Sequence, residues 1–191
     1  MSSRRTLREY EDGASATTWD ELNAACRKFT FGRGFDHYRV SIVSKEASLV
    51  LFDPPYAAHN YPTGYRRAIK SLPGFDPVAE AFIAGQLSPC VWDQSFYAEA
   101  GALERWLILA KHGLAQGVTV ATIDRERPRL SLSVSSGTAL PQSRDELNEV
   151  AAEVLLFAYW IAPAIHALMD RASHDPLLDR IERGVLTKLS C

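Results

Sequence analysis

The stretch Gly117–Ser135, GVTVATIDRERPRLSLSVS, determines the fold class. In its two halves, Gly117–Asp124 and Leu130–Ser135, apolar residues alternate with polar ones, and this period of two predicts two β-strands. The charged segment between them contains Pro128, which favours a turn. We therefore expect both strands to belong to one antiparallel sheet.

Further strands are expected upstream of this pair. Tyr38–Ser44, YRVSIVS, alternates in the same way and predicts a half-buried strand. Ser48–Asp53, SLVLFD, follows a short polar turn and predicts a second strand, so we expect the two to form a hairpin. Pro89–Trp92 is predicted as a short extended segment.

Helical patterns flank these strands. After a polar start, the expected helices lie at Trp19–Phe31, Pro62–Ser71, from Asp76-Pro77 onward, Ala100–His112 and Arg144–Ala172. The last has two apolar stripes side by side, so it needs cover on more than one side. One side is expected to pack on the sheet, and the other is either a homodimer interface or simply buried. The order of elements indicates an α/β fold with an antiparallel sheet of about five strands and helices on both faces.

Composition narrows the function classes. The 191 residues carry a net charge of −2, which gives no electrostatic footprint for nucleic acid. The three cysteines, Cys26, Cys90 and Cys191, form neither a disulfide framework nor a zinc pattern. The charged N-terminus lacks a secretory signal, and the longest apolar run, 154–165, is too short to span a bilayer. We expect one soluble, cytoplasmic domain that binds no membrane.

Catalytic and cofactor motifs are scarce. The segment GRGFDH at 32–37 precedes a strand instead of following one, so it is no dinucleotide fingerprint. No P-loop, G-x-S-x-G or H-E-x-x-H motif is present. The five histidines have no metal-ligand spacing, so we expect neither a metal nor another cofactor. A Cys90 nucleophile served by a histidine stays open as an enzymatic alternative, although nothing beside Cys90 lowers its pKa.

Polar and aromatic residues in apolar contexts are the remaining candidates: Tyr61, Tyr65, Asp76, Trp92 and Ser131. Each also has an ordinary structural explanation. Asp76 is a good N-cap for the Pro77 helix, the aromatic residues suit a core, and Ser131 faces solvent if only one side of the sheet is covered. The residues alone therefore indicate a soluble α/β sensor or binding domain.

Several segments, taken in order, resemble the autoinducer-binding domain of LuxR-type quorum-sensing regulators. These are Gly34–Tyr38 (GFDHY), Asn60-Tyr61-Pro62, Asp76-Pro77-Val78, Pro89–Trp92 (PCVW), Trp106–Gly117 and Leu130–Ser133. They cover residues 18–172 with near-normal spacing. The resemblance implies an α/β/α sandwich that encloses an N-acyl homoserine lactone and has no catalytic activity.

The same resemblance implies roles for individual residues. Asp76 would accept a hydrogen bond from the ligand amide N–H, a charge-assisted bond. Tyr61 and Ser131 would hydrogen-bond the amide carbonyl, and Trp92 would wall the lactone ring. Apolar residues would line the tail, namely Val40, Val78, Phe82, Trp106, Leu107 and Leu114.

Two positions depart from the family pattern. Tyr65 stands where the family usually has a tryptophan that donates to the lactone carbonyl, and Ile69 stands where it typically has tyrosine. A Tyr65 phenol can still donate, but from a different position. The ligand is therefore expected to be an N-acyl homoserine lactone, an aryl one, or another small molecule.

The resemblance also suggests the wider organisation. Residues 1–172 would form the ligand-binding and dimerisation domain, with a homodimer formed through the 144–172 helix. Residues 173–191 would be a linker toward a helix-turn-helix domain absent from this chain, through which alone DNA would be bound. The alternative is a truncated or orphan protein that acts by heterodimerisation or senses a non-lactone ligand.

Overall fold

An antiparallel sheet forms the centre of the computed structural model, which describes residues 3–43, 58–70, 72, 76–124, 126–138, 140–141 and 143–173. In these residues it has four strands in the order β1 (His37–Val43), β4 (Arg129–Ser136), β3 (Gln116–Ala121) and β2 (Cys90–Trp92). The strands predicted at 38–44, 117–124 and 130–135 are confirmed, although β3 ends three residues earlier. The strand and hairpin predicted at 48–53 lie outside the described residues.

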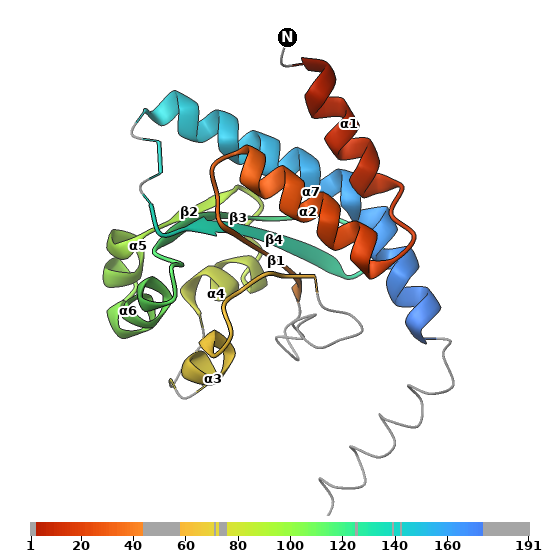
Figure 1. Ribbon diagram of the computed structural model, residues 1–191. Coiled ribbons are helices and arrows are strands. Elements are labelled where there is room, and N and C mark those ends of the chain that lie inside the picture. The colour runs from red at the N-terminus through yellow and green to blue at the C-terminus, as the bar shows by residue number, and fades with distance from the viewer. Residues whose placement is uncertain are drawn as a thin grey trace, which may run out of the picture.

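Helices cover both faces of the sheet, as predicted (Figure 1). One face carries α1 (Ser3–Ala14), α2 (Trp19–Gly32) and α7 (Arg144–Ser173). The other carries four short helices: α3 (Tyr65–Lys70), α4 (Pro77–Ile83), α5 (Gln94–Glu99) and α6 (Leu103–Lys111). The α-β-α sandwich is confirmed. The helix expected at 100–112 is confirmed as α6, and α5 before it was not predicted.

The period of two along the strands divides the sheet into two chemically different faces. Tyr38, Val40, Val118, Leu132 and Val134 point to one side, where they form the larger core with α2 and α7. This core accounts for the alternation of the strands, since each apolar side chain is removed from water there. The residues between them face the four short helices.

Local capping sets where several helices begin. Thr18 and Glu21 form a capping box at the start of α2. The carboxylate of Asp76 accepts from the Val78 amide at the start of α4, and Asp93 does the same for α5 through Phe96. Pro77 follows Asp76 in the first turn, as predicted.

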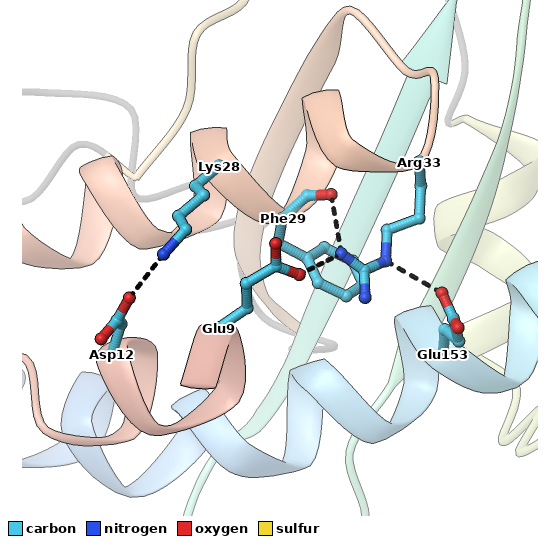
Figure 2. Close-up of polar contacts among 6 residues, drawn as sticks. All are labelled: Glu9, Asp12, Lys28, Phe29, Arg33 and Glu153. Atoms are coloured by element: carbon cyan, nitrogen blue, oxygen red, sulfur yellow. Dashed lines mark hydrogen bonds and ion pairs between the residues drawn. The ribbon is translucent and has the colours of Figure 1, made fainter. Parts of the chain in front are cut away.

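The N-terminal helix α1 was not predicted, because its segment is polar apart from a few residues. It packs on α7 at Gly13, where an added Cβ would lie 2.7 Å from Ile161 Cγ2. Figure 2 shows Arg33, the residue that caps the end of α2, between two carboxylates, Glu9 of α1 and Glu153 of α7. The Arg33 side chain is only 10% exposed and lies 4.0 Å above the Phe29 ring. Charge and packing together hold the three helices in place.

The long helix α7 is apolar enough, by length and composition, to cross a bilayer. Half of that stretch is nevertheless buried inside the protein. Val154, Phe157, Ile161 and Ile165 lie within the larger core, and Phe157 stacks on Phe29 at 4.0 Å between ring centroids. We therefore interpret α7 as the central helix of the larger core, on the face of the sheet that it covers with α1 and α2.

Candidate functional site

A cavity of about 70 Å³ lies between the second face of the sheet and the short helices. It is lined by residues of β1 to β4, of α3 to α6 and of the segment before α3. The lining residues are Arg39, Ser41, Ile42, Val43, Tyr61, Tyr65, Asp76, Val78, Ala79, Phe82, Ile83, Trp92, Tyr97, Leu109, Thr119, Ser131 and Ser133.

The floor of the cavity is the polar face of the sheet. Arg39 pairs with Ser133, Ser41 pairs with Ser131, and Thr119 pairs with Ser133 across the strands. Although these residues alternate with core residues, most are buried, because α3 to α6 cover this face as well. The question of whether Ser131 faces solvent or a second covered side is thus answered in favour of the covered side.

A chain of hydrogen bonds fixes Trp92 on this floor. Its indole Nε1 donates to Thr119 Oγ1 at 2.9 Å, and the Thr119 and Ser133 hydroxyls lie 2.7 Å apart. Gly117 makes room for the ring, because a Cβ there would lie 2.6 Å from Trp92 Cζ2. Trp92 is therefore both a core residue and a wall of the cavity.

Asp76 both caps α4 and lines the cavity, and the sequence had left these two roles open. Its Oδ1 accepts from the Val78 amide at 2.9 Å and from the Tyr97 hydroxyl at 3.1 Å. Within the described part of the chain, Oδ2 accepts no hydrogen bond. The helix cap thus holds the carboxylate at the cavity, with one oxygen still able to accept a hydrogen bond.

Three tyrosines surround this carboxylate. Tyr61 and Tyr65 meet edge to face at 5.3 Å, and Tyr97 contacts Trp92 in the same way at 6.1 Å. Burial raises the pKa of all three phenols above its ordinary value, and the positive charge of Arg39 only partly offsets this for Tyr61. They therefore stay protonated at neutral pH and can donate hydrogen bonds.

The roof of the cavity is apolar. It consists mainly of Val78, Ala79, Phe82 and Ile83 from α4. Arg129 of β4 connects this helix to the sheet, because its guanidinium donates to the carbonyls of Phe82 at 3.0 Å and Gln86 at 2.9 Å. A polar floor, an apolar roof and one carboxylate suit a mostly apolar ligand with a few polar groups.

Seven of the eleven candidate residues come together at the cavity: Tyr61, Tyr65, Asp76, Val78, Phe82, Trp92 and Ser131. The structure does not place the other four there. Leu107 is 55% exposed, because Arg105 and Leu109 occupy the buried face of α6. The Trp106 indole donates to the Ala115 carbonyl at 2.6 Å, and Leu114 is buried in the core beside the cavity. Val40 lies on the opposite face of the sheet.

Sequence reasoning missed several lining residues, above all Arg39, Ser41, Tyr97, Thr119 and Ser133. The signal for four of them was present in the alternation of the strands, which places them on the same face as Ser131. What the alternation lacked was any indication that this face is covered.

The chemistry of the site offers little for catalysis. Burial, and after it the negative charge of Asp76, raises the pKa of the Cys90 thiol to about 11. The thiol is therefore protonated at neutral pH, unlike the thiolate that a nucleophile requires. Among the described residues, no cluster of His, Cys, Asp or Glu could hold a metal ion.

Comparisons with known proteins agree with this fold. The sequence profile of the family "Autoinducer binding domain" matches residues 18–167, and no curated protein matches the chain significantly. Among solved structures, the N-acylhomoserine lactone-dependent LuxR family transcription factor CepR2 from Burkholderia cenocepacia superposes with a TM-score of 0.65 at 20% identity. That match covers 88% of this chain and 96% of the CepR2 chain.

Two structures of SdiA have the same fold. Residues 1–171 of Escherichia coli SdiA give a TM-score of 0.56 at 23% identity, covering 87% of this chain and 92% of that one. SdiA in complex with octanoyl-rac-glycerol gives a TM-score of 0.55 at 20% identity, covering 90% of this chain and 66% of that one. At these identities the likeness is one of fold.

Proposed function

Because the chain belongs to the autoinducer-binding domain family, we propose that it is the sensing domain of a LuxR-type quorum-sensing regulator in the cytoplasm. Its cavity would bind an N-acyl or aryl homoserine lactone. The observation that carries this proposal is the buried hydroxyl-bearing floor that faces an apolar roof, with Asp76 at the edge between them.

The amide of such a ligand matches Asp76. Its N–H can donate to Oδ2, while Oδ1 keeps its bonds to Val78 and Tyr97. A charged acceptor in a buried site makes a stronger hydrogen bond than a neutral one. The carboxylate would therefore fix both the position and the direction of the amide.

Other polar groups fit the remaining oxygens of the ligand. The hydroxyls of Tyr61 and Ser131 would donate to the amide carbonyl, and the Tyr65 phenol would donate to the lactone carbonyl. The Trp92 ring would pack against the lactone, since its own N–H is already bonded to Thr119. The apolar tail would then lie beneath Val78 and Phe82.

The volume of the cavity implies a movement on binding. About 70 Å³ is well below the roughly 300 Å³ of a small ligand pocket. A lactone would therefore push the α4 roof away from the sheet as it enters. Because the ligand binds only the folded state, it would also raise the unfolding temperature.

Thermal unfolding of the purified chain with a panel of acyl and aryl homoserine lactones tests the proposal. We expect at least one lactone to raise the melting temperature, and Asp76→Asn to reduce that shift strongly. Asparagine also caps helices well, so the substitution changes the charge more than the cap. No shift with any lactone would contradict the lactone proposal.

Asp93→Asn is the matched control for this experiment. Asp93 caps α5 as Asp76 caps α4, but it is exposed and does not line the cavity. The ligand-induced shift should therefore survive Asp93→Asn. Equal effects of the two substitutions would contradict the role proposed for Asp76.

A ligand without a lactone is the second candidate, favoured by the SdiA structure that contains octanoyl-rac-glycerol. An acyl glycerol offers hydroxyl groups to the serine-rich floor, but it lacks the amide N–H that Asp76 would bind. A stabilising effect of octanoyl glycerol, with none from any lactone, would select this candidate.

The outer face of α7 suits a homodimer. Five of its exposed residues, Ala152, Leu156, Tyr159, Pro163 and Ala167, follow one another at helical spacing and carry no charge. We expect Leu156→Glu to shift the chain toward monomer in sedimentation experiments. Leu107→Glu places the same charge on an exposed leucine of α6 and should leave the association unchanged.

The remaining organisation stays a proposal. Residues 1–172 would form the sensing and dimerising unit, and 173–191 would lead to a helix-turn-helix domain that binds DNA. A chain that lacked such a domain could still pair with a full-length partner through α7 and block it.

A further inference from the structure

A tyrosine of α5 is hydrogen-bonded to the carboxylate that would bind the ligand. The Tyr97 hydroxyl donates to Asp76 Oδ1 at 3.1 Å, and Tyr97 is only 2% exposed. An ionised carboxylate can only accept hydrogen bonds, so the phenol is the donor. Burial, and after it the negative charge of Asp76, raises the pKa of Tyr97 well above its ordinary value. The phenol therefore keeps the proton that makes this bond at neutral pH.

Contacts other than this hydrogen bond hold the Tyr97 ring in place. The Tyr97 carbonyl accepts from the Ala102 amide at 2.7 Å, which anchors the backbone after α5. The ring meets Trp92 edge to face at 6.1 Å and Phe96 at 5.6 Å. The hydroxyl is therefore presented to Asp76 from a fixed point, and removal of the hydroxyl alone should leave the ring where it is.

Two donors meet at the same oxygen of Asp76. The Val78 amide reaches Oδ1 at 2.9 Å from the start of α4, and the Tyr97 hydroxyl reaches it from α5. The terminal torsion of an aspartate side chain is broad, so a helix cap alone leaves the plane of the carboxylate free to turn. The second donor on Oδ1 restricts this rotation and keeps Oδ2 in one defined position.

Together, Tyr97 and Asp76 present an acceptor to the cavity. The single hydroxyl proton of Tyr97 is used by Asp76, and a carboxylate oxygen carries only lone pairs. A ligand N–H that meets Oδ2 gains a charge-assisted hydrogen bond. An ester oxygen at the same point brings its own lone pairs against the carboxylate and gains no hydrogen bond.

We infer that Tyr97 is a positioning residue, which holds the Asp76 carboxylate so that the cavity selects ligands linked through an amide over the same ligands linked through an ester. The inference rests on the proposed function and refines it, since it names a second residue on which recognition of the linkage depends. Tyr97 acts through Asp76, and its hydroxyl makes no bond to the ligand.

Two matched pairs of ligands test this inference by calorimetric titration of the purified chain. The first pair is N-octanoyl homoserine lactone and α-octanoyloxy-γ-butyrolactone, in which an oxygen replaces the amide N–H. The second pair is N-cinnamoyl homoserine lactone and α-cinnamoyloxy-γ-butyrolactone. In at least one pair, the amide should bind about tenfold or more tightly, the gain expected from one hydrogen bond to a charged group.

Variants then assign that preference to the bond between Tyr97 and Asp76. Tyr97→Phe should lower the amide-to-ester affinity ratio at least about threefold, since the carboxylate can then turn away from the ligand. Asp76→Ser keeps a residue that caps helices but removes the second oxygen, and it should bring the ratio to about one. The double variant should show the same ratio as Asp76→Ser, because Tyr97 acts only through the carboxylate.

Tyr38→Phe is the matched control. Tyr38 is also buried, and its hydroxyl donates to Asn23 Oδ1 at 2.7 Å, but it belongs to the larger core on the opposite face of the sheet. Each substitution removes one buried hydroxyl, so the two should cost similar stability. Only Tyr97→Phe should change the amide-to-ester ratio, which a purely structural role of Tyr97 would leave unaltered.

The failures are distinguishable. Equal affinities of amide and ester in both pairs, or a ratio that Tyr97→Phe leaves unchanged, would overturn the positioning role while the sensing of a lactone stands. A ratio that falls equally in Tyr38→Phe would overturn it as well. If none of the four ligands binds, the proposed function itself is contradicted, and the role of Tyr97 is rejected with it.

Discussion

At the scale of single residues, Gly117 has a role that only the packing reveals. A Cβ at this position would lie 2.6 Å from Trp92 Cζ2 and even closer to the Val134 carbonyl oxygen. We expect Gly117→Ala to lower the free energy of unfolding by about 1–3 kcal/mol, the usual cost of overpacking. The substitution should also displace Trp92 from the cavity, which denaturant unfolding followed by tryptophan fluorescence would detect.

Gly32→Ala provides the control for that prediction. Gly32 ends α2, and the nearest atom to an added Cβ is Glu9 Oε1 at 3.8 Å. Alanine should therefore be neutral or slightly stabilising there, because it favours the helix. A similar loss of stability in both variants would contradict the packing account of Gly117.

At the scale of elements, the docking of α1 depends on Arg33. Removing its side chain leaves the carboxylates of Glu9 and Glu153 without their cation. We expect Arg33→Met to reduce the free energy of unfolding by about 2 kcal/mol, since Arg33 is nearly buried and Glu153 is partly exposed. Denaturant unfolding measures this loss directly.

The neighbouring pair in Figure 2 gives the comparison. Lys28 and Asp12 also join α2 to α1, but their side chains are 52% and 44% exposed. Exposed ion pairs contribute little, so Lys28→Met should change stability by less than about 1 kcal/mol. A larger effect from Lys28→Met than from Arg33→Met would contradict the importance of burial here.

The α4 roof depends in the same way on Arg129. Its two bonds to backbone carbonyls near the end of α4 connect this short helix to β4. We expect Arg129→Met to speed hydrogen exchange of the α4 amides at least about tenfold, because local opening then breaks fewer bonds. Arg127→Met, which breaks an exposed pair with Asp170, should leave that exchange unchanged.

At the scale of the whole molecule, the buried thiols and phenols predict that the folded protein becomes less stable at alkaline pH. Burial raises the pKa of Cys90 to about 11 and of Cys26 to about 12, and it raises the pKa of Tyr65 and Tyr97 as well. Above about pH 9 the unfolded chain loses these protons while the folded chain keeps them. The unfolded state then binds fewer protons, so stability must fall as pH rises.

Chemical denaturation at about pH 8 and about pH 11 checks this prediction. Cys90 alone should lower the free energy of unfolding by about 2 kcal/mol across that interval, since each unit of pKa shift corresponds to about 1.4 kcal/mol. Cys90→Ala should show a smaller decrease than the wild type. A free energy that stays constant or rises between these pH values would contradict the burial of the ionisable groups.

Much of the fold could be predicted from periodicity. The strands at 37–43, 116–121 and 129–136 and the long α7 repeat their apolar residues so regularly that the faces are evident. Helix α1 was missed because its docking comes from a few long-range contacts, chiefly Tyr10, Gly13 and the Arg33 network. Contacts between distant segments leave no periodic signal in a polar sequence.

The candidate site could be predicted only in part. The resemblance to a family identified Asp76, Trp92, Tyr61 and Tyr65, because these positions lie in or beside its motifs. Arg39 and Ser41 escaped, since alternation tells which residues share a face but not whether helices cover it. Leu107 was placed wrongly, because the register of a short helix such as α6 depends on its packing partners.

A crystal structure of the chain with its best-binding lactone tests the central claim most directly. The account predicts the ligand between the polar face of the sheet and α4, with its amide nitrogen within hydrogen-bond distance of Asp76 Oδ2 and α4 shifted outward. A ligand bound elsewhere, or one in the cavity that makes no contact with Asp76, would contradict it.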